Sequence, residues 1–328
     1  MIWLRCRLGP DIGWGHAMRC WSLAQAMTAE GIEAGFILDD DAGDFRRRVS
    51  EGGFAHRTIP RNLSPQAEAS AYPPGPVVLD LSNAQCRTGL PALVAALKAS
   101  GRKIAVIEGL GPDAFGGPVP PDLLVTPYLG ATADQSYQIP HLVGAAYAVL
   151  APEYGAPPTP LETRDRLLVM MSGSDPWQLT EIALAALGPF GPRLLVAIGG
   201  GIAEARAAAI ETGVVQLGGE AVSAPSSLHP LFMRSRVALI GPGLVKYEAV
   251  ATQTPAVILS PGEEFDAAQS AFVEAGLAER LTVGQPDLTL ALQRAVQNAL
   301  EQIPEAPPPI DGRGAHRLAL ALRTHLGE

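Results

Sequence analysis

The chain has 328 residues, of which 47% are hydrophobic and 17% charged, and its net charge at pH 7 is −9. This length favours two domains over one, and the acidic balance without a Lys/Arg run argues against nucleic acid or an anionic membrane as a partner. No uninterrupted apolar run approaches the roughly 18 residues of a membrane-spanning helix, and the N-terminus has no secretory leader pattern. Three unclustered cysteines fit a reducing compartment, so we expect a soluble, cytoplasmic protein.

The N-terminal segment predicts a strand, a glycine loop and a helix. An apolar run at 2–8 precedes Gly13-Trp14-Gly15-His16, and apolar residues recur with helical spacing over 17–27. Glycines let the backbone approach a ligand, and the first N–H groups of a helix favour an anion. Gly13, Gly15 and Arg19 are therefore candidate phosphate ligands, with His16 as a titratable neighbour. The alternative is a tight turn with an incidental histidine.

The rest of the N-terminal half alternates strands with helices. Buried strands are expected at 35–38, 77–80, 103–108 and 122–126, which indicates an α/β fold with a mostly parallel sheet. Ligands collect at the carboxyl ends of such strands, where Asp80 and Glu108 stand. These two carboxylates either face a ligand or cap the next helix. The acidic run 39–41 is expected to be a solvated loop.

A proline-rich linker at 152–160 separates this half from a second one of the same kind. We therefore predict Rossmann-like domains over 1–155 and 156–328, facing each other across a cleft. After a strand at 166–171, a turn at 172–176 is expected to lead into a helix over 177–187 with Asp175 as its N-cap. Ser174 in this turn is a candidate anion ligand. A C-terminal helix over 312–326 is expected to pack on one of the domains.

The second strong pattern is Gly241-Pro242-Gly243, which follows a strand at 237–240. The backbone of this turn and of the next helix, from Leu244, is expected to contact a diphosphate; the candidates are Gly241, Gly243, Leu244, Val245 and Lys246. Glu248, about one and a half turns further on, is suited to accept both hydroxyls of a ribose. The alternative for Glu248 is an ordinary surface glutamate. The six histidines form no H-x-x-x-H pair, so no metal site is expected.

Segment 12–20 resembles the opening of the PseG/SpsG family, and further resemblances recur at 142–154, 172–176, 243–248 and 311–315. The family hydrolyses UDP-2,4-diacetamido-2,4,6-trideoxy-β-L-altropyranose in pseudaminic acid synthesis, which serves flagellin and surface glycans. The resemblance implies a MurG-like GT-B fold, UDP bound by the C-terminal domain, inversion by water, and no metal or other cofactor. It places His16 beside the scissile bond, where a neutral imidazole can orient or deprotonate water.

Several positions depart from the family pattern. Ser82 stands where the family has a tyrosine, and Glu108-Gly109 replaces Asp-Asp. The hydroxyl residues of the nucleotide loop become Leu244-Val245-Lys246, and an Asn-Gln pair falls near Glu264-Phe265. We take His16 and Asp80 as the catalytic candidates; whether the strand-end carboxylates Asp80 and Glu108 replace the missing tyrosine is open. The alternatives are a GT-B glycosyltransferase and a non-catalytic protein that binds a nucleotide sugar.

Overall fold

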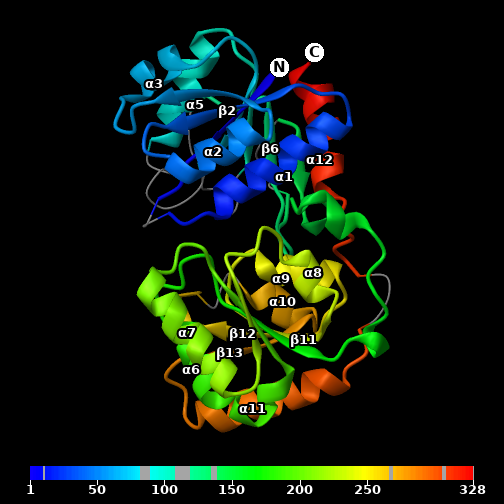
Figure 1. Cartoon of the computed structure of the whole chain (residues 1–328). Coiled ribbons are helices and arrows are strands. Elements are labelled where there is room, and N and C mark those ends of the chain that lie inside the picture. The colour runs from blue at the N-terminus through cyan, green and yellow to red at the C-terminus, as the bar shows by residue number, and fades with distance from the viewer. Residues whose placement is uncertain are drawn as a thin grey trace. The chain divides into compact units, whose positions relative to one another are not determined.

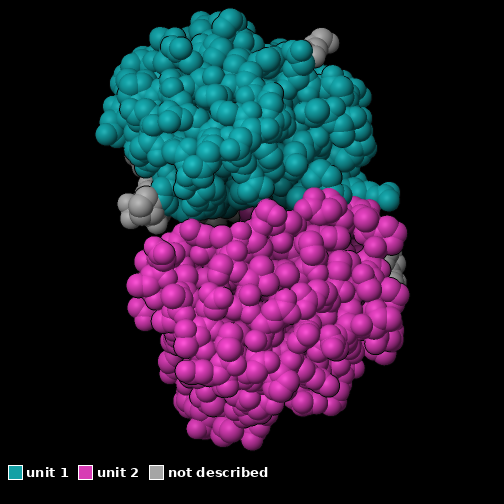
Figure 2. Space-filling model, in the orientation of Figure 1, with its two compact units in different colours: residues 1–152, 312–328 teal, residues 153–311 magenta. Residues whose placement is uncertain are grey.

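The computed structural model describes residues 1–9, 12–81, 89–107, 119–133, 139–265, 269–304 and 308–327. The chain forms two compact units, coloured separately in Figure 2: unit 1 is Met1–Pro152 with Gly312–Glu328, and unit 2 is Glu153–Asp311. The division therefore falls at 152 instead of 155, and the C-terminal helix belongs to the first unit. No helix among the described residues is long and apolar enough to cross a membrane.

Unit 1 is built on a seven-stranded sheet in the order β3-β2-β1-β4-β5-β6-β7, in which every neighbouring pair is parallel. This confirms the predicted parallel sheet. Its strands are β1 Ile2–Cys6, β2 Ala34–Asp39, β3 Ala55–Ile59, β4 Val77–Asp80, β5 Ile104–Ile107, β6 Leu123–Thr126 and β7 His141–Val143. The helices, shown in Figure 1, are α1 Gly15–Ala29, α2 Gly43–Glu51, α3 Pro65–Ala71, α5 Leu90–Ala99 and α12 Gly314–Leu326, with a 3-10 turn η2 at Ala145–Tyr147.

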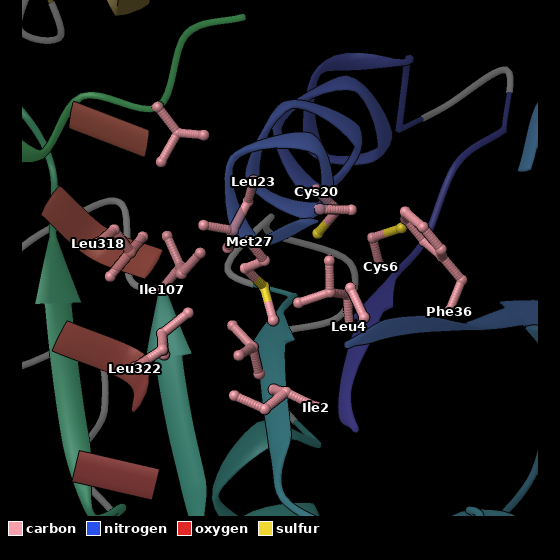
Figure 3. Packing of buried hydrophobic residues seen from close by; sticks show 14 of the residues in the cluster. Ile2, Leu4, Cys6, Cys20, Leu23, Met27, Phe36, Ile107, Leu318 and Leu322 are labelled. Atoms are coloured by element: carbon pink, nitrogen blue, oxygen red, sulfur yellow. The ribbon is translucent and has the colours of Figure 1, made fainter. Parts of the chain in front are cut away.

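The core of unit 1 joins the two ends of the chain. Leu23 and Met27 of α1 pack in one buried cluster with Leu318 and Leu322 of α12, above the strands of the sheet (Figure 3). All four side chains are fully buried. The C-terminal helix is therefore part of the unit's hydrophobic core, because its apolar face packs against α1 and excludes water there.

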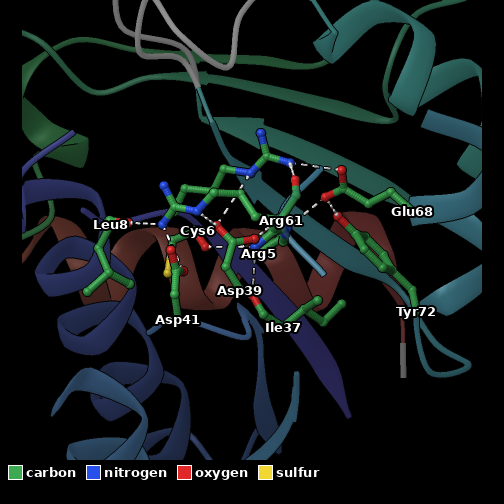
Figure 4. Close-up of polar contacts among 10 residues, drawn as sticks. Arg5, Cys6, Leu8, Ile37, Asp39, Asp41, Arg61, Glu68 and Tyr72 are labelled. Carbon is green, nitrogen blue, oxygen red and sulfur yellow. Dashed lines mark hydrogen bonds and ion pairs between the residues drawn. The ribbon is translucent and has the colours of Figure 1, made fainter. Parts of the chain in front are cut away.

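A buried ion network fixes the carboxyl ends of β1 and β2 (Figure 4). Arg5 is fully buried and donates to Asp39 at 2.6 Å and to Glu68 at 2.8 Å. Arg7 and Tyr72 also donate to Glu68, at 3.0 and 2.8 Å. The expectation of a solvated acidic loop is thus wrong for Asp39, which is fully buried because Arg5 and its neighbours compensate its charge.

Unit 2 has a six-stranded parallel sheet in the order β10-β9-β8-β11-β12-β13. Its strands are β8 Arg166–Met170, β9 Leu194–Ile198, β10 Glu220–Ser223, β11 Ser235–Ile240, β12 Ala256–Ser260 and β13 Ala278–Thr282. The helices are α6 Leu179–Ala186, α7 Glu204–Gln216, α8 His229–Phe232, α9 Val245–Ala251, α10 Ser270–Glu274 and α11 Leu288–Glu301. Short 3-10 turns are η3 Pro152–Gly155, η4 Leu161–Thr163, η5 Gly188–Arg193 and η6 Glu263–Phe265.

The helix predicted from 177 begins two residues later, at Leu179. Asp175 has a left-handed backbone (φ 42°), and its carboxylate accepts hydrogen bonds from the backbone N–H groups of Leu179 (2.9 Å) and Thr180 (3.1 Å). Asp175 therefore accepts from the free N–H groups at the N-terminus of α6, as a capping residue does, but it lies three residues before the N-cap position, Gln178. Trp177 is left outside the helix and is 45% exposed.

Candidate functional site

The loop between β1 and α1 is closed by its own backbone. The N–H groups of Ile12 and Gly13 both donate to the carbonyl of Gly9, at 3.1 and 2.8 Å. Gly13 has φ 77°, a conformation that favours glycine. The N–H of Gly13 is thus used inside the loop, in contrast to the expectation that it faces a ligand. Gly15 is exposed and is the first residue of α1.

The loop is also held from the side by Arg61, which follows β3. Its guanidinium donates to the carbonyl of Leu8 at 2.6 Å and to Asp41 at 2.9 Å. A Cβ atom at Gly9 would lie 3.3 Å from the same guanidinium. Arg61 therefore holds the chain at Leu8, just after β1. No motif around Arg61 in the chain predicts this contact.

The first side chain of α1 meets the last residue of β4. Cys6 pairs with Asp80 in the sheet, which brings Asp80 beside the glycine loop. His16 Nδ1 lies 2.6 Å from Asp80 Oδ1, and Arg19 Nε donates to Asp80 Oδ2 at 2.7 Å. The structure thus brings together both residues that the sequence suggests as catalytic.

The ionisation of Asp80 determines the direction of its hydrogen bond with His16. Burial raises the pKa of Asp80, but the Arg19 guanidinium and His16 outweigh it and hold that pKa well below its usual range. An ionised carboxylate only accepts, so His16 Nδ1 is the donor in the 2.6 Å contact with Asp80. Arg19 Nη2 also lies 3.1 Å from Nδ1, but it then donates to Asp80 and not to the histidine. His16 Nε2 is then the basic nitrogen, and no described residue bonds to it. The His16 side chain is 17% exposed, which leaves part of the ring accessible.

Arg19 does not lie where a phosphate ligand was expected. Its side chain is 4% exposed, and its guanidinium holds Asp80 and donates to the hydroxyl of Tyr128 at 2.5 Å. The geometry fits a positioning residue that orients Asp80. Tyr128 was missed in the sequence, although it follows β6 at the same carboxyl edge of the sheet. Ser82 and Glu108 lie outside the described residues.

In unit 2, the two glycines of the turn after β11 have different surroundings. The N–H of Gly241 donates to Met170 at 3.0 Å, and a Cβ atom at Gly241 would lie 2.0 Å from the carbonyl oxygen of Met171. Gly241 is therefore needed for the close approach of β11 to β8. Gly243 is exposed and has open space around it. Only the second glycine presents a surface to a ligand.

The residues after this turn lie on α9 or at its start. Leu244 is half-buried and Val245 is buried. Lys246 is 6% exposed, donates to the carbonyl of Pro242 at 3.0 Å, and lies over the ring of Phe272 at 5.2 Å. Burial lowers its pKa to about 8. Lys246 therefore braces the turn from inside the unit, whereas the sequence suggested a cation exposed to a diphosphate.

Glu248 is half-buried on the same helix, beside Tyr154. Burial raises the pKa of Glu248 to about 7, and burial with the nearby Glu248 carboxyl raises the pKa of Tyr154 well above its usual value. The Tyr154 hydroxyl is buried, and it makes no hydrogen bond of good geometry to any described residue. The two groups thus form a polar pair that a ligand with hydroxyl groups can satisfy.

The turn after β8 completes the carboxyl edge of this sheet. Ser174 is half-buried, and the N–H of Gly201 donates to the carbonyl of Gly173 at 2.8 Å. A cavity of about 230 Å³ lies between this turn and the turn after β11. It is lined by Met171, Ser172, Trp177, Leu179, Pro242, Gly243 and Phe265. The described residues contain no group of three or more side chains suited to a metal ion.

Comparison with known proteins gives the architecture. No family model and no curated protein matches the chain. Solved structures match over nearly its whole length: Acinetobacter baumannii MurG has 11% identity and a TM-score of 0.61, covering 96% of this chain and 94% of that one. The fold is GT-B.

Two further GT-B neighbours were solved with nucleotides. The S. aureus MnaA–UDP structure has 14% identity and a TM-score of 0.64, with 99% of this chain and 96% of that chain covered. The Methanocaldococcus jannaschii UDP-GlcNAc 2-epimerase, in complex with UDP-GlcNAc and UDP, has 11% identity and a TM-score of 0.60, covering 98% and 99%. At these identities the likeness establishes the fold.

Proposed function

We propose that the chain is a metal-independent hydrolase of a nucleotide sugar, releasing UDP and free sugar from a UDP-linked diacetamido-trideoxy sugar of the pseudaminic acid type. The observation that carries the proposal is the 2.6 Å contact between His16 and Asp80. A histidine oriented by a buried carboxylate is a general base, because the carboxylate fixes the tautomer and stabilises the imidazolium that forms.

In the proposed reaction a water oxygen bonds to the anomeric carbon, and the bond from that carbon to the UDP oxygen breaks. His16 Nε2 takes the proton of the water, and UDP leaves with the electron pair of the broken bond. Attack from the face opposite the leaving group inverts the anomeric centre. Asp80 stays ionised throughout, and Arg19 keeps it in place.

Unit 2 is proposed to hold the UDP. The exposed Gly243, with Leu244, Val245 and Ser174, would contact the diphosphate, and Glu248 with Tyr154 would accept and donate hydrogen bonds to the ribose. The support is that Ser174 and Gly243 follow β8 and β11, at the carboxyl ends of two neighbouring parallel strands. UDP is present in the MnaA and epimerase structures named above, which share the fold.

The test is a mass-spectrometric screen of nucleotide sugars in ¹⁸O-labelled water. Label in the sugar and not in UDP would establish attack at carbon. His16→Ala is expected to lower kcat by about 10²–10⁴-fold, as for the loss of a general base, with the Kd for UDP unchanged. Unaltered turnover by His16→Ala would remove this residue from the mechanism, and binding without any product would leave a non-catalytic binder.

A GT-B glycosyltransferase is the second candidate. The comparisons favour it, because the matches include glycosyltransferases such as the spinosyn rhamnosyltransferase SpnG. The His16–Asp80 pair would serve equally to deprotonate an acceptor hydroxyl. In that case UDP release would depend on an added acceptor, whereas the hydrolase releases UDP in water alone.

A further inference from the structure

The hydroxyl of Tyr128 makes a contact that has no part in the reaction proposed above. Arg19 Nη1 donates to this hydroxyl at 2.5 Å. In the sheet of unit 1, β5 lies between β4, which ends at Asp80, and β6, which ends two residues before Tyr128. The guanidinium of Arg19 therefore bridges the carboxyl ends of two strands that are not neighbours in the sheet.

The backbone around Tyr128 is held on both sides. Pro127, which is buried, has a fixed φ angle directly before it. The carbonyl of Tyr128 accepts from the N–H of Ala131 at 3.2 Å, and Gly130 has φ 78° inside this turn. Glycine is the residue that permits a left-handed third position in a turn. Tyr128 thus presents its hydroxyl from a defined backbone position, which a side chain needs if it is to orient another.

Arg19 and His16 share one oxygen of Asp80. Asp80 Oδ1 lies 2.5 Å from Arg19 Nη2 and 2.6 Å from His16 Nδ1, and these two nitrogens are 3.1 Å apart. If Nη2 donates to the carboxylate, Nδ1 carries the ring proton and Nε2 is basic. If Nη2 turns and donates to Nδ1, the ring proton must be on Nε2, which then cannot take a proton from water. The direction of Arg19 Nη2 therefore decides between the two tautomers.

The direction of Nη2 depends on how the rest of the guanidinium is held. The group is planar, so its three nitrogens move together. Nε donates to Asp80 Oδ2 at 2.7 Å, and Nη1 donates to Tyr128 on another side of the group. With both nitrogens held, the plane cannot turn Nη2 away from Asp80 towards His16. Without the Tyr128 hydroxyl, only the contacts to Asp80 oppose that turn.

We propose that Tyr128 is a positioning residue that selects the tautomer of His16. Its hydroxyl holds Arg19 on Asp80, so that His16 Nδ1 donates to the carboxylate and Nε2 stays without a proton. The inference rests on the proposed function, in which Nε2 is the base. Tyr128 need not touch the substrate for this role, because it acts through Arg19 and Asp80.

The experiment is nitrogen-15 NMR of the histidine rings in the full chain, without substrate. Protonated and unprotonated ring nitrogens have different shifts, so the spectrum gives the ratio of the two neutral tautomers, and the signals of His16 are those that His16→Ala removes. Wild type is expected to show the Nδ1–H form. Tyr128→Phe removes only the hydroxyl and is expected to change the ratio towards the Nε2–H form by at least about tenfold, as for the loss of a hydrogen bond to a charged group. The kcat for UDP release is expected to fall in proportion to the remaining Nδ1–H fraction, with the Kd for UDP unchanged.

Two further variants show whether the effect passes through Arg19. Tyr147→Phe is the same substitution at another half-buried tyrosine of unit 1, and it is expected to leave the ratio unchanged. In an Arg19→Lys background there is no planar fork to hold, so Tyr128→Phe is expected to add no further change. An unchanged ratio in Tyr128→Phe, or a further change in the Arg19→Lys background, would overturn the inference. The NMR measurement involves no turnover, so a wild-type chain that releases no UDP would contradict the proposed function alone.

Discussion

Asp80 is a buried carboxylate that contributes to the packing of unit 1 and to the chemistry that we propose. It is fully buried, and Arg19, which is itself nearly buried, offsets the loss of hydration. His16 uses the remaining face of the same carboxylate. A change at Asp80 therefore affects the tautomer of the histidine and the free energy of unfolding together.

Asp80→Asn is expected to lower kcat strongly and to reduce the free energy of unfolding by about 3–5 kcal/mol, because Arg19 is left buried without a counter-charge. The pKa of Asp80 is lowered in the folded state, so its stabilisation is present above the unfolded-state pKa of about 4. It is lost as the pH falls through the folded value. Urea unfolding at pH 7 and pH 3 measures this, and an unchanged difference between variant and wild type at the two pH values would contradict it.

The pKa of Glu248 is shifted in the opposite direction from that of Asp80, so its effect on stability has the opposite pH dependence. Its pKa is raised to about 7, so the folded state is favoured when Glu248 is protonated, and this advantage is lost as the pH rises through 7. Glu248→Gln is therefore expected to be more stable than wild type at pH 8 but to bind UDP more weakly there, since the ionised carboxylate is the better acceptor for ribose hydroxyls. Titrations at pH 6 and 8 test this.

The control for Glu248 is the ratio of the UDP affinity of Glu248→Gln to that of the wild type, measured at each pH. UDP itself titrates in this range, and its titration cancels when variant and wild type are compared at each pH. A ratio that is the same at pH 6 and pH 8 would mean that the charge of Glu248 is not used in binding.

Among the elements, the turn after β11 contains one glycine that the packing requires, Gly241, and one that we propose to contact UDP, Gly243. In Gly241→Ala the new Cβ atom would lie 2.0 Å from the carbonyl oxygen of Met171, so β11 and β8 must move apart. We expect a loss of at least about 1–3 kcal/mol in the free energy of unfolding. Gly243→Ala meets no atom within 4 Å and is expected to keep its stability but to weaken UDP binding. Chemical denaturation and calorimetry of the two variants distinguish these roles, and equal destabilisation would contradict them.

The sequence was informative where the signal is local. Apolar runs located the inner strands of both sheets but missed the four edge strands β3, β7, β10 and β13, which are less buried and so carry no continuous apolar run. The glycine loop before α1 and the location of Asp80 at the end of a strand together indicated that His16 and Asp80 lie at the same edge of the sheet. Contacts between distant segments were not predictable. The burial of Asp39 depends on Arg5, 34 residues away, and the role of Arg61 depends on a carbonyl 53 residues away. Arg19 looked like a phosphate ligand because its helical spacing shows the face on which it lies, but not which carboxylate it meets.

At the scale of the whole molecule, unit 1 is discontinuous in the chain, since α12 supplies part of its core. A chain ending at residue 311 exposes Leu23 and Met27 of α1, and it is expected to lose the cooperative unfolding of unit 1. Unit 2 is built from one continuous segment, so its unfolding transition and its binding of UDP are expected to persist. Calorimetric unfolding with and without UDP tests both points. Retention of a native unit 1 transition would show that α12 is dispensable.

The same connectivity sets an order of events during synthesis. Domains generally fold as units while the chain emerges from the ribosome, N-terminal segments first. Here the last segment of unit 1 emerges only after all of unit 2. Residues 1–152 therefore cannot complete unit 1 until unit 2 has been synthesised, and until then the surface that packs against α12 stays exposed. The glycine loop and His16, near the start of the chain, thus belong to the part of the protein that matures last.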